Sequence, residues 1–241
     1  VMQLDLMQLN SVREFAEVFK QNFKRLDILL NNAGIMMPPY QLTADGIESQ
    51  QGTNHFGHFA LTGLLLEVLK QTPGSRVVNV SSIAHKQGAM DFDNLLYEGG
   101  KGYSPLAAYG RSKLENLLFT FELQRYFYAY KYHTIAVVAH PGVSDTNLFS
   151  QIGGTALQPI INPIHPLCTQ PASMAALPAL RASVDTDAKP GDFYGPDGFA
   201  EMRGYPVVVQ PSKAAQNSED ARKLWKLSEE ITGVKFDIKG D

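Results

Sequence analysis

The segment Leu26-Asp27-Ile28-Leu29-Leu30-Asn31-Asn32-Ala33-Gly34 joins a short apolar run to a polar end that contains glycine. Short apolar runs bounded by turn residues are typical of buried strands. Two later segments repeat this form: Arg76–Ser82 ends in two serines, and Thr134–Gly142 ends in a Pro-Gly pair. The sequence therefore predicts three strands of one buried, parallel sheet, at 26–30, 76–80 and 134–139.

Helical patterns occupy the segments around these strands. A helix is expected from Ser11 to Lys24, with Ser11 as its N-cap because Glu14 follows at the capping-box spacing. Further helices are expected over 54–70, 107–130 and 214–231. This alternation predicts an α/β fold whose helices cover both faces of an open sheet. No repeat or linker divides the chain, so we expect one domain over 1–241, with a substrate-covering segment at about 147–178.

The sequence Tyr109-Gly-Arg-Ser-Lys113 places a phenol and an ammonium on one face of the third expected helix. A nearby ammonium favours the phenolate, so Lys113 is expected to lower the pKa of Tyr109 and make it a general acid or base. Tyr97 and Lys101 have the same spacing, but two glycines lie between them. That pair is expected to lie in a loop, because glycine disfavours a helix interior.

Composition limits the classes of function. The chain has 241 residues and a formal net charge of -3, without the basic run of a nucleic-acid-binding protein. Its one cysteine, Cys168, cannot form an intrachain disulfide, which favours a reducing, cytoplasmic location. The sequence contains no run of about 20 apolar residues, so no membrane span is predicted. The six histidines form no persuasive metal-binding set, so no metal site is predicted.

Five motifs occur in an order that resembles the short-chain dehydrogenase/reductase family. They are the Asn-Asn-Ala-Gly turn at 31–34, Asn54, the serine-ended strand at 77–82, the Tyr109/Lys113 pair and Pro141-Gly142. The resemblance covers nearly the whole chain and implies a Rossmann-like doubly wound sheet. Within the family, the segments 198–205 and 224–230 resemble the retinol-dehydrogenase-like branch, which also has an insertion comparable to Met90–Pro105.

The resemblance implies a role for each of four catalytic residues. Tyr109 is expected to be the general acid/base at the substrate oxygen, and Lys113 to tune it and hold the nicotinamide ribose. Ser82 matches the residue that hydrogen-bonds the substrate oxygen. Asn54 matches the residue that positions a water on the proton path from Lys113 to solvent.

The same resemblance implies NADP or NAD as the cofactor, with contacts from both strand-end segments. Besides Tyr109 and Lys113, the expected cofactor-binding residues are Asp5 near the adenine, Asn32, Ala33 and Gly34 near the adenine ribose, and Pro141, Gly142, Val143 and Thr146 near the nicotinamide. The determinants that separate NAD from NADP normally follow the second strand of the family, which this sequence does not show.

The N-terminal region departs from the family pattern. Val1–Leu6 resembles the family's third strand, and no glycine-rich, phosphate-binding turn precedes Asn31. Truncation relative to the family is the favoured interpretation, with a fragment or a degenerate relative that binds no dinucleotide as the others. The strand at 26–30 would then present an unpaired apolar edge.

Two apolar groups have more than one interpretation. The aromatic run Tyr126, Phe127, Tyr128, Tyr130 and Tyr132 is expected to pack in the core at a helix end, with a ligand cage as the alternative. A second group is expected to serve either the core or the interface of a homodimer, since family members commonly pair through these helices: Leu61, Leu64, Leu65, Leu117, Leu118 and Phe121.

The leading functional hypothesis is an NAD(P)-dependent oxidoreductase that interconverts an alcohol and a carbonyl on a lipophilic small molecule. One alternative is a cofactor-free relative that acts as a binding or interaction module. Another is a reductase of the same fold with a different target, such as a carbon–carbon double bond. Stoichiometric binding of a nicotinamide cofactor would favour the enzyme over the binding module.

Overall fold

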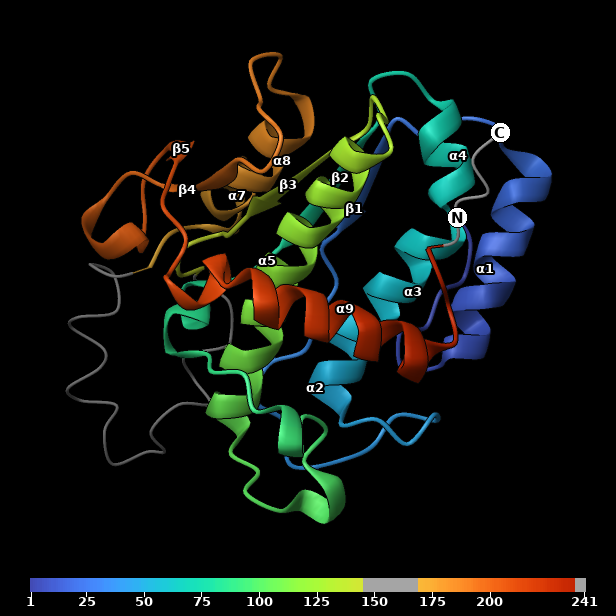
Figure 1. Ribbon diagram of the computed structural model, residues 1–241. Helices are drawn as coiled ribbons and strands as arrows, with labels where there is room; N and C mark the ends of the chain where they lie inside the picture. Colours follow the sequence, from blue (N-terminus) through green and yellow to red (C-terminus); the bar gives the residue numbers. More distant parts are fainter. Residues whose placement is uncertain (145–168, 237–241) are drawn as a thin grey trace.

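The computed structural model describes residues 1–144 and 169–236, and its centre is one five-stranded sheet (Figure 1). The strand order is β1-β2-β3-β4-β5; the first four strands are parallel and β5 is antiparallel to β4. This confirms the predicted α/β fold. The strands are β1 (Ile28–Asn31), β2 (Arg76–Val80), β3 (Ile135–Ala139), β4 (Phe193–Pro196) and β5 (Pro206–Val208).

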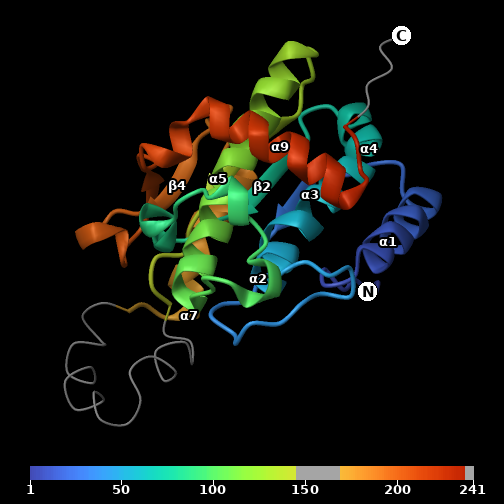
Figure 2. The same ribbon diagram turned by 60° about the horizontal axis from the view of Figure 1, so that its bottom comes forward.

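Helices cover both faces of the sheet. The longest, α5, packs against β2 and β3 on one face, whereas α8 packs against β2, β3 and β4 on the other. In Figures 1 and 2, α9 crosses α5 and α3 on the side away from the sheet. The helices are α1 (Leu9–Asn22), α2 (Ser49–Gln51), α3 (Gly57–Leu64), α4 (Leu66–Gln71), α5 (Pro105–Ala129), α7 (Ala172–Ala175), α8 (Leu177–Val184) and α9 (Ser218–Thr232).

Short turns of other helix types connect these elements. A π-helical turn, η1 (Gly52–Phe56), joins α2 to α3, so the helix expected from 54 to 70 is interrupted there and again at Leu65, before α4. The 3₁₀ turns are η2 (Ile83–Gln87), η3 (Phe92–Asn94), η4 (Glu98–Gly100), η6 (Phe199–Glu201) and η7 (Ala214–Gln216).

Residues 1–6 do not form the strand that the sequence suggested. Residues 1–5 are irregular and a turn follows at 6–7. An extended segment needs a neighbouring strand for its hydrogen bonds, and among the described residues β1 pairs only with β2. Ser11 is not the N-cap either: Gln8 holds that position, while Ser11 Oγ accepts a hydrogen bond from the Asp5 N–H at 3.0 Å.

Strand β1 forms one edge of the sheet, as expected. Its side chains alternate, with Leu29 and Asn31 buried, whereas Ile28 and Leu30 are 40% and 41% exposed. The edge therefore combines free backbone groups with apolar side chains.

Four of the six apolar side chains that the sequence left open between core and dimer interface are buried, and residues of α9 belong to or pack against the same clusters. Leu61 and Leu65 belong to a core cluster against which Leu64, Trp225 and Ile231 pack, and Leu117 and Leu118 share a second cluster with Leu224. Phe121 packs against that second cluster. The core interpretation therefore holds for Leu61, Leu65, Leu117 and Leu118, whereas Leu64 and Phe121 are partly buried. Homodimerisation stays a prediction.

The aromatic run at the end of α5 divides between core and surface. Phe127 is fully buried, and Tyr126 and Tyr132 pack against its cluster. Tyr128 and Tyr130 are 85% and 52% exposed, so the expectation of core packing was wrong for these two. Successive helical residues point about 100° apart, which prevents a continuous run from facing one side.

The loop expected for Tyr97 and Lys101 is also found, because Tyr97 precedes the short turn η4 in a left-handed conformation.

Cys168 and most of the expected substrate-covering segment lie outside the described residues. Its remainder, 169–178, includes α7 and the first residues of α8. Within the described ranges, no helix has both the length and the apolar character required to cross a membrane.

Glu115 on α5 is a buried acid without a hydrogen-bonding partner. Its side chain is fully buried, and both carboxylate oxygens are unpaired in the described structure. Burial raises its pKa well above the usual value, the Arg111 guanidinium opposes that rise, and Glu48 adds to it. The Arg111 guanidinium is mainly engaged by carbonyl oxygens, including that of Asn94 at 2.8 Å.

Replacing Glu115 by glutamine is expected to stabilise the protein, and more so at pH 8 than at pH 4. A carboxyl whose pKa is raised on folding favours the folded state fully below its unfolded pKa, and this contribution is lost as the pH rises toward the folded value. The gain at pH 8 should be about 1.4 kcal/mol for each unit by which folding raises the pKa, because glutamine stays uncharged without taking up a proton. Denaturant midpoints at both pH values, with the exposed Glu17→Gln as control, test this; a gain independent of pH contradicts it.

Candidate functional site

The polar ends of three parallel strands meet at one edge of the sheet. Asn31 pairs in register with Asn79, and Val80 pairs with Ala139. The segments that follow β1, β2 and β3 therefore lie beside one another, where ligands bind in open α/β sheets. Asn31 also links the layers, because its Nδ2 donates to Asn79 Oδ1 at 2.8 Å and to Thr62 Oγ1 on α3 at 3.0 Å.

Helix α5 brings Tyr109 and Lys113 to this edge. The Lys113 Nζ lies 5.8 Å from the centroid of the Tyr109 ring and donates to the Val80 carbonyl at 3.1 Å. The lysine is 5% exposed, and burial lowers its pKa to about 8. The predicted pair is thus assembled, with the ammonium directed at the end of β2.

Ser82 reaches Tyr109 from the end of β2. Burial raises the pKa of Tyr109, and a hydrogen bond with the Ser82 side chain acts in the opposite direction. The expected lowering of this pKa by Lys113 is therefore not found, because burial outweighs the favourable interactions and the ammonium bonds Val80 instead. A phenol with a raised pKa keeps its proton at neutral pH.

Close backbone packing holds Ser82 against α5. Ser81 Oγ donates to the Lys113 carbonyl at 2.7 Å, which anchors the strand end to the helix. A Cβ on Gly88 would collide with the Gly110 carbonyl, and one on Gly110 would lie 3.0 Å from the Ala84 carbonyl. Both glycines thus allow η2, the turn after Ser82, to approach α5. Gly110 follows Tyr109 in the sequence, but the spacing of residues along the chain does not reveal that it packs against η2.

Asn54 fixes the loop after β1 from within the π-helical turn. Its Oδ1 accepts from the Ile35 N–H at 2.8 Å, and its Nδ2 donates to the Ile35 carbonyl and to Ser112 Oγ, both at 2.9 Å. Its main-chain carbonyl bonds His58 Nδ1 at 3.1 Å. Turns of π-helix are frequent at functional sites.

The turn expected near the adenine ribose, formed by Asn32, Ala33 and Gly34, is exposed and directly precedes Ile35, which Asn54 holds. A Cβ on Gly34 would come within 2.9 Å of Asn54 Oδ1 and 3.4 Å of Lys113 Nζ. The structure therefore brings Asn54 and Lys113 together at this turn, while Lys113 connects it to Tyr109.

The expected nicotinamide segment follows β3. Gly142 has a left-handed backbone (φ 68°), and the Val143 N–H donates to the Met202 carbonyl at 2.7 Å. Gln170 Nε2 donates to the Pro141 carbonyl at 2.8 Å. Gln170 and Met202 were not identified from the sequence, because neither belongs to a recognisable motif. Thr146 lies outside the described residues.

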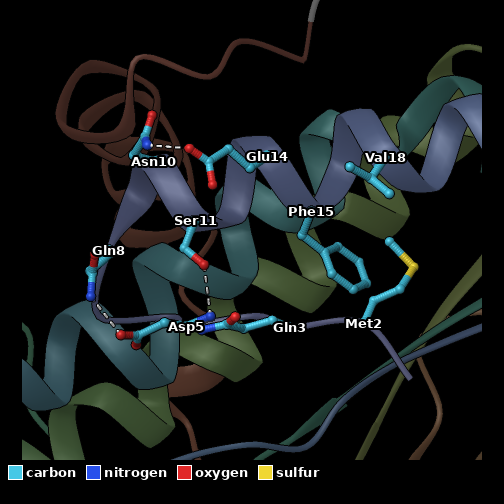
Figure 3. A pocket seen from close by; sticks show the side chains of 9 residues that line it. All are labelled: Met2, Gln3, Asp5, Gln8, Asn10, Ser11, Glu14, Phe15 and Val18. Carbon is cyan, nitrogen blue, oxygen red and sulfur yellow. Dashed lines mark hydrogen bonds between the residues drawn. The ribbon is translucent and has the colours of Figure 1, made fainter.

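Asp5 lines a pocket to which none of the four candidate catalytic residues contributes. Its carboxylate accepts from the Met7 N–H at 2.9 Å and from Gln8 Nε2 at 2.8 Å. Figure 3 shows Asp5 between the N-terminal segment and α1, in a pocket of about 430 Å³ whose lining residues all lie between 2 and 18. The structure therefore does not join Asp5 to the four candidate catalytic residues, and its adenine contact stays a prediction.

Known proteins resemble this chain over most of its length. The family model for short chain dehydrogenases matches residues 1–94. Retinol dehydrogenase 13 of Homo sapiens is 39% identical over 236 residues, which cover 96% of this chain and 68% of that protein. Retinol dehydrogenase 12 of Mus musculus is 39% identical over 244 residues, covering 98% and 71%.

One solved structure is similar at the same level. The crystal structure of an uncharacterized protein from Mycobacterium paratuberculosis has a TM-score of 0.80 and 41% identity, and the match covers 99% of this chain and 77% of that one. Its fold agrees with the sheet and helices described above. The chain therefore belongs to the short-chain dehydrogenase/reductase family of oxidoreductases, in the retinol-dehydrogenase-like branch.

Proposed function

We propose that this protein interconverts an alcohol and a carbonyl on a lipophilic small molecule, with NADP or NAD as the hydride carrier. The observation that carries the proposal is the grouping of Tyr109 with Ser82, whose side chain lowers the pKa of the phenol, and with the buried ammonium of Lys113, 5.8 Å from the centroid of the Tyr109 ring. Two hydroxyls held near one another can together bind a single substrate oxygen. Family membership supports the reaction class.

Tyr109 is the proton donor in the direction of carbonyl reduction. Its raised pKa keeps the phenol protonated at neutral pH, which suits an acid that delivers a proton to the oxygen as the carbonyl is reduced. Ser82 is the second donor to that oxygen and stabilises its developing negative charge. In the oxidation direction the phenolate is needed, so the rate should rise with pH.

The residues around Lys113 fit the nicotinamide half of the coenzyme. The ammonium of Lys113 and the Pro141–Val143 segment would hold it, and the exposed turn Asn32–Gly34 would lie beside the adenine ribose, since these segments follow three neighbouring strand ends. The coenzyme supplies hydride chemistry that no side chain can provide. The chain's own part is to orient both molecules and to move the proton between Tyr109 and the substrate oxygen.

The names of the curated relatives point to retinol as the first substrate to test. Retinol is a lipophilic alcohol, in agreement with the expectation from the sequence. Fluorescence titrations with NADPH and NADH, followed by assays with retinol and retinaldehyde, test the proposal. Saturable binding at one coenzyme per chain, with turnover of either compound, is expected. The absence of binding to both coenzymes, by this chain and by a version extended upstream, would overturn the proposal in favour of a cofactor-free binding module.

A further inference from the structure

Glu201, in η6, lies between two segments that build the candidate active site. Its Oε1 accepts a hydrogen bond from Lys86 Nζ at 2.8 Å, and its Oε2 lies 3.0 Å from His140 Nε2. Lys86 belongs to η2, which begins directly after Ser82, and His140 directly precedes Pro141. One carboxylate therefore connects the segment after β2 with the segment after β3.

The hydrogen bonds of His140 define its tautomer. The Gly142 N–H donates to His140 Nδ1 at 3.2 Å, so Nδ1 carries no proton. The proton is then on Nε2, from which it is donated to Glu201. The imidazole is fully buried, and a Cβ on Gly195 would collide with its Nε2. The ring thus transmits the position of Glu201 to the backbone of Gly142.

The backbone around Glu201 is held in an unfavourable conformation. Ala200 and Glu201 have φ values of 51° and 59°, in the left-handed region that side chains other than glycine rarely adopt. Such residues persist where surrounding contacts hold them, and they concentrate at functional sites. The next residue, Met202, accepts the hydrogen bond from the Val143 N–H. Two successive residues of this loop therefore hold the 141–143 segment: Glu201 acts through His140, and Met202 bonds Val143 directly.

The charge of Glu201 strengthens both contacts. Hydrogen bonding to His140 is the largest of the effects that bring its pKa to about 2, and Lys86 adds to the lowering. The carboxylate is therefore ionised wherever the protein is folded and active, and hydrogen bonds to ionised groups are roughly twice as strong as neutral ones.

We propose that Glu201 is a positioning residue that fixes the Pro141–Val143 segment relative to Ser82 by bonding His140 and Lys86 simultaneously. This inference rests on the proposed function, because Pro141–Val143 is the segment expected at the nicotinamide and Ser82 is the expected partner of the substrate oxygen. Glu201 would thereby set the spacing between the hydride carrier and the proton donors without touching either.

Two substitutions separate this role from simple support of the loop. Glu201→Asn suits the left-handed backbone better than glutamate does, but its side chain is one methylene shorter and cannot span both partners. Glu201→Gln keeps the length and an acceptor for His140, but it loses the charge that bonds Lys86. Glu17→Gln, on the exposed side of α1, is the matched control.

In turnover assays, Glu201→Asn should lower kcat by about 10- to 100-fold, the scale expected when reacting groups are misplaced by about 1 Å. The KM for the substrate should change less than kcat does, because no substrate contact is removed. Glu201→Gln should fall between Glu201→Asn and the wild type, and Glu17→Gln should match the wild type.

Two readouts do not require the coenzyme. In Glu201→Asn, the amide of Gly142 should exchange its hydrogen about tenfold faster, and nitrogen NMR of His140 should show loss of the fixed Nε2–H tautomer. Unchanged exchange and an unchanged tautomer in a folded Glu201→Asn variant would overturn the positioning role. If both change as expected but the wild type binds no coenzyme, the contact is supported and the proposed function fails.

Discussion

Replacing Tyr109 by phenylalanine is expected to lower kcat for carbonyl reduction by about 10²- to 10⁴-fold, the usual contribution of a general acid. The change removes one hydroxyl and leaves the ring of the half-buried side chain in place. The rise of the oxidation rate with pH should disappear in the same variant, because it reports ionisation of the phenol. Steady-state absorbance of the reduced coenzyme, measured in both directions between pH 6 and 10, provides the test.

Tyr128→Phe is the matched control for this substitution. Tyr128 lies on the same helix and is 85% exposed, so the kcat of the Tyr128→Phe variant should equal that of the wild type. The coenzyme dissociation constant of Tyr109→Phe should stay within about threefold of the wild type, since this loss is one of proton transfer. A Tyr109→Phe variant with near-normal kcat would contradict the assigned role.

Replacing Phe59 by alanine is expected to lower the free energy of unfolding by about 3–5 kcal/mol, as large-to-small changes of buried aromatic residues do. Phe59, on α3, is fully buried. Its ring centroid lies 5.2 Å from that of Phe119 and 5.3 Å from that of Trp225. The substitution therefore opens a cavity where α3, α5 and α9 meet.

Trp225 is the only tryptophan in the chain, so its fluorescence reports this region directly during denaturant unfolding. Tyr128→Ala, which truncates an exposed aromatic side chain, should change the free energy of unfolding by about 0.5 kcal/mol or less. A loss below 1 kcal/mol in Phe59→Ala would show that α9 does not depend on this aromatic cluster.

The sequence predicted β1, β2, β3 and α5 well because their signals are local. The apolar runs 76–80 and 134–139 each end in turn or hydroxyl residues, and the segment after Gly110 contains no glycine or proline to interrupt a helix. The Tyr109/Lys113 pair follows from the period of that helix. The loop around Tyr97 was predicted for the same local reason, since glycines lie next to it.

Features that depend on distant partners were missed or wrong. Residues 1–6 resemble a strand of the family, but no strand lies beside them in the described part of the sheet. The contacts of Glu201 join residues 115 and 61 positions away, which no spacing rule detects. The raised pKa of Tyr109 likewise reflects burial by the assembled fold, about which the local Tyr-Lys spacing carries no information.

The π-helical turn at Gly52–Phe56 also sets the rotational phase of everything after it. Such a turn is equivalent to an α-helix with one inserted residue, and each residue advances the helix by about 100°. The Gly57 N–H bonds the Gly52 carbonyl, which marks the widened turn. This one extra residue lets Asn54 face the loop after β1 while Phe59 faces α9. A relative that lacks one residue within this turn would therefore need compensating changes along the whole of α3.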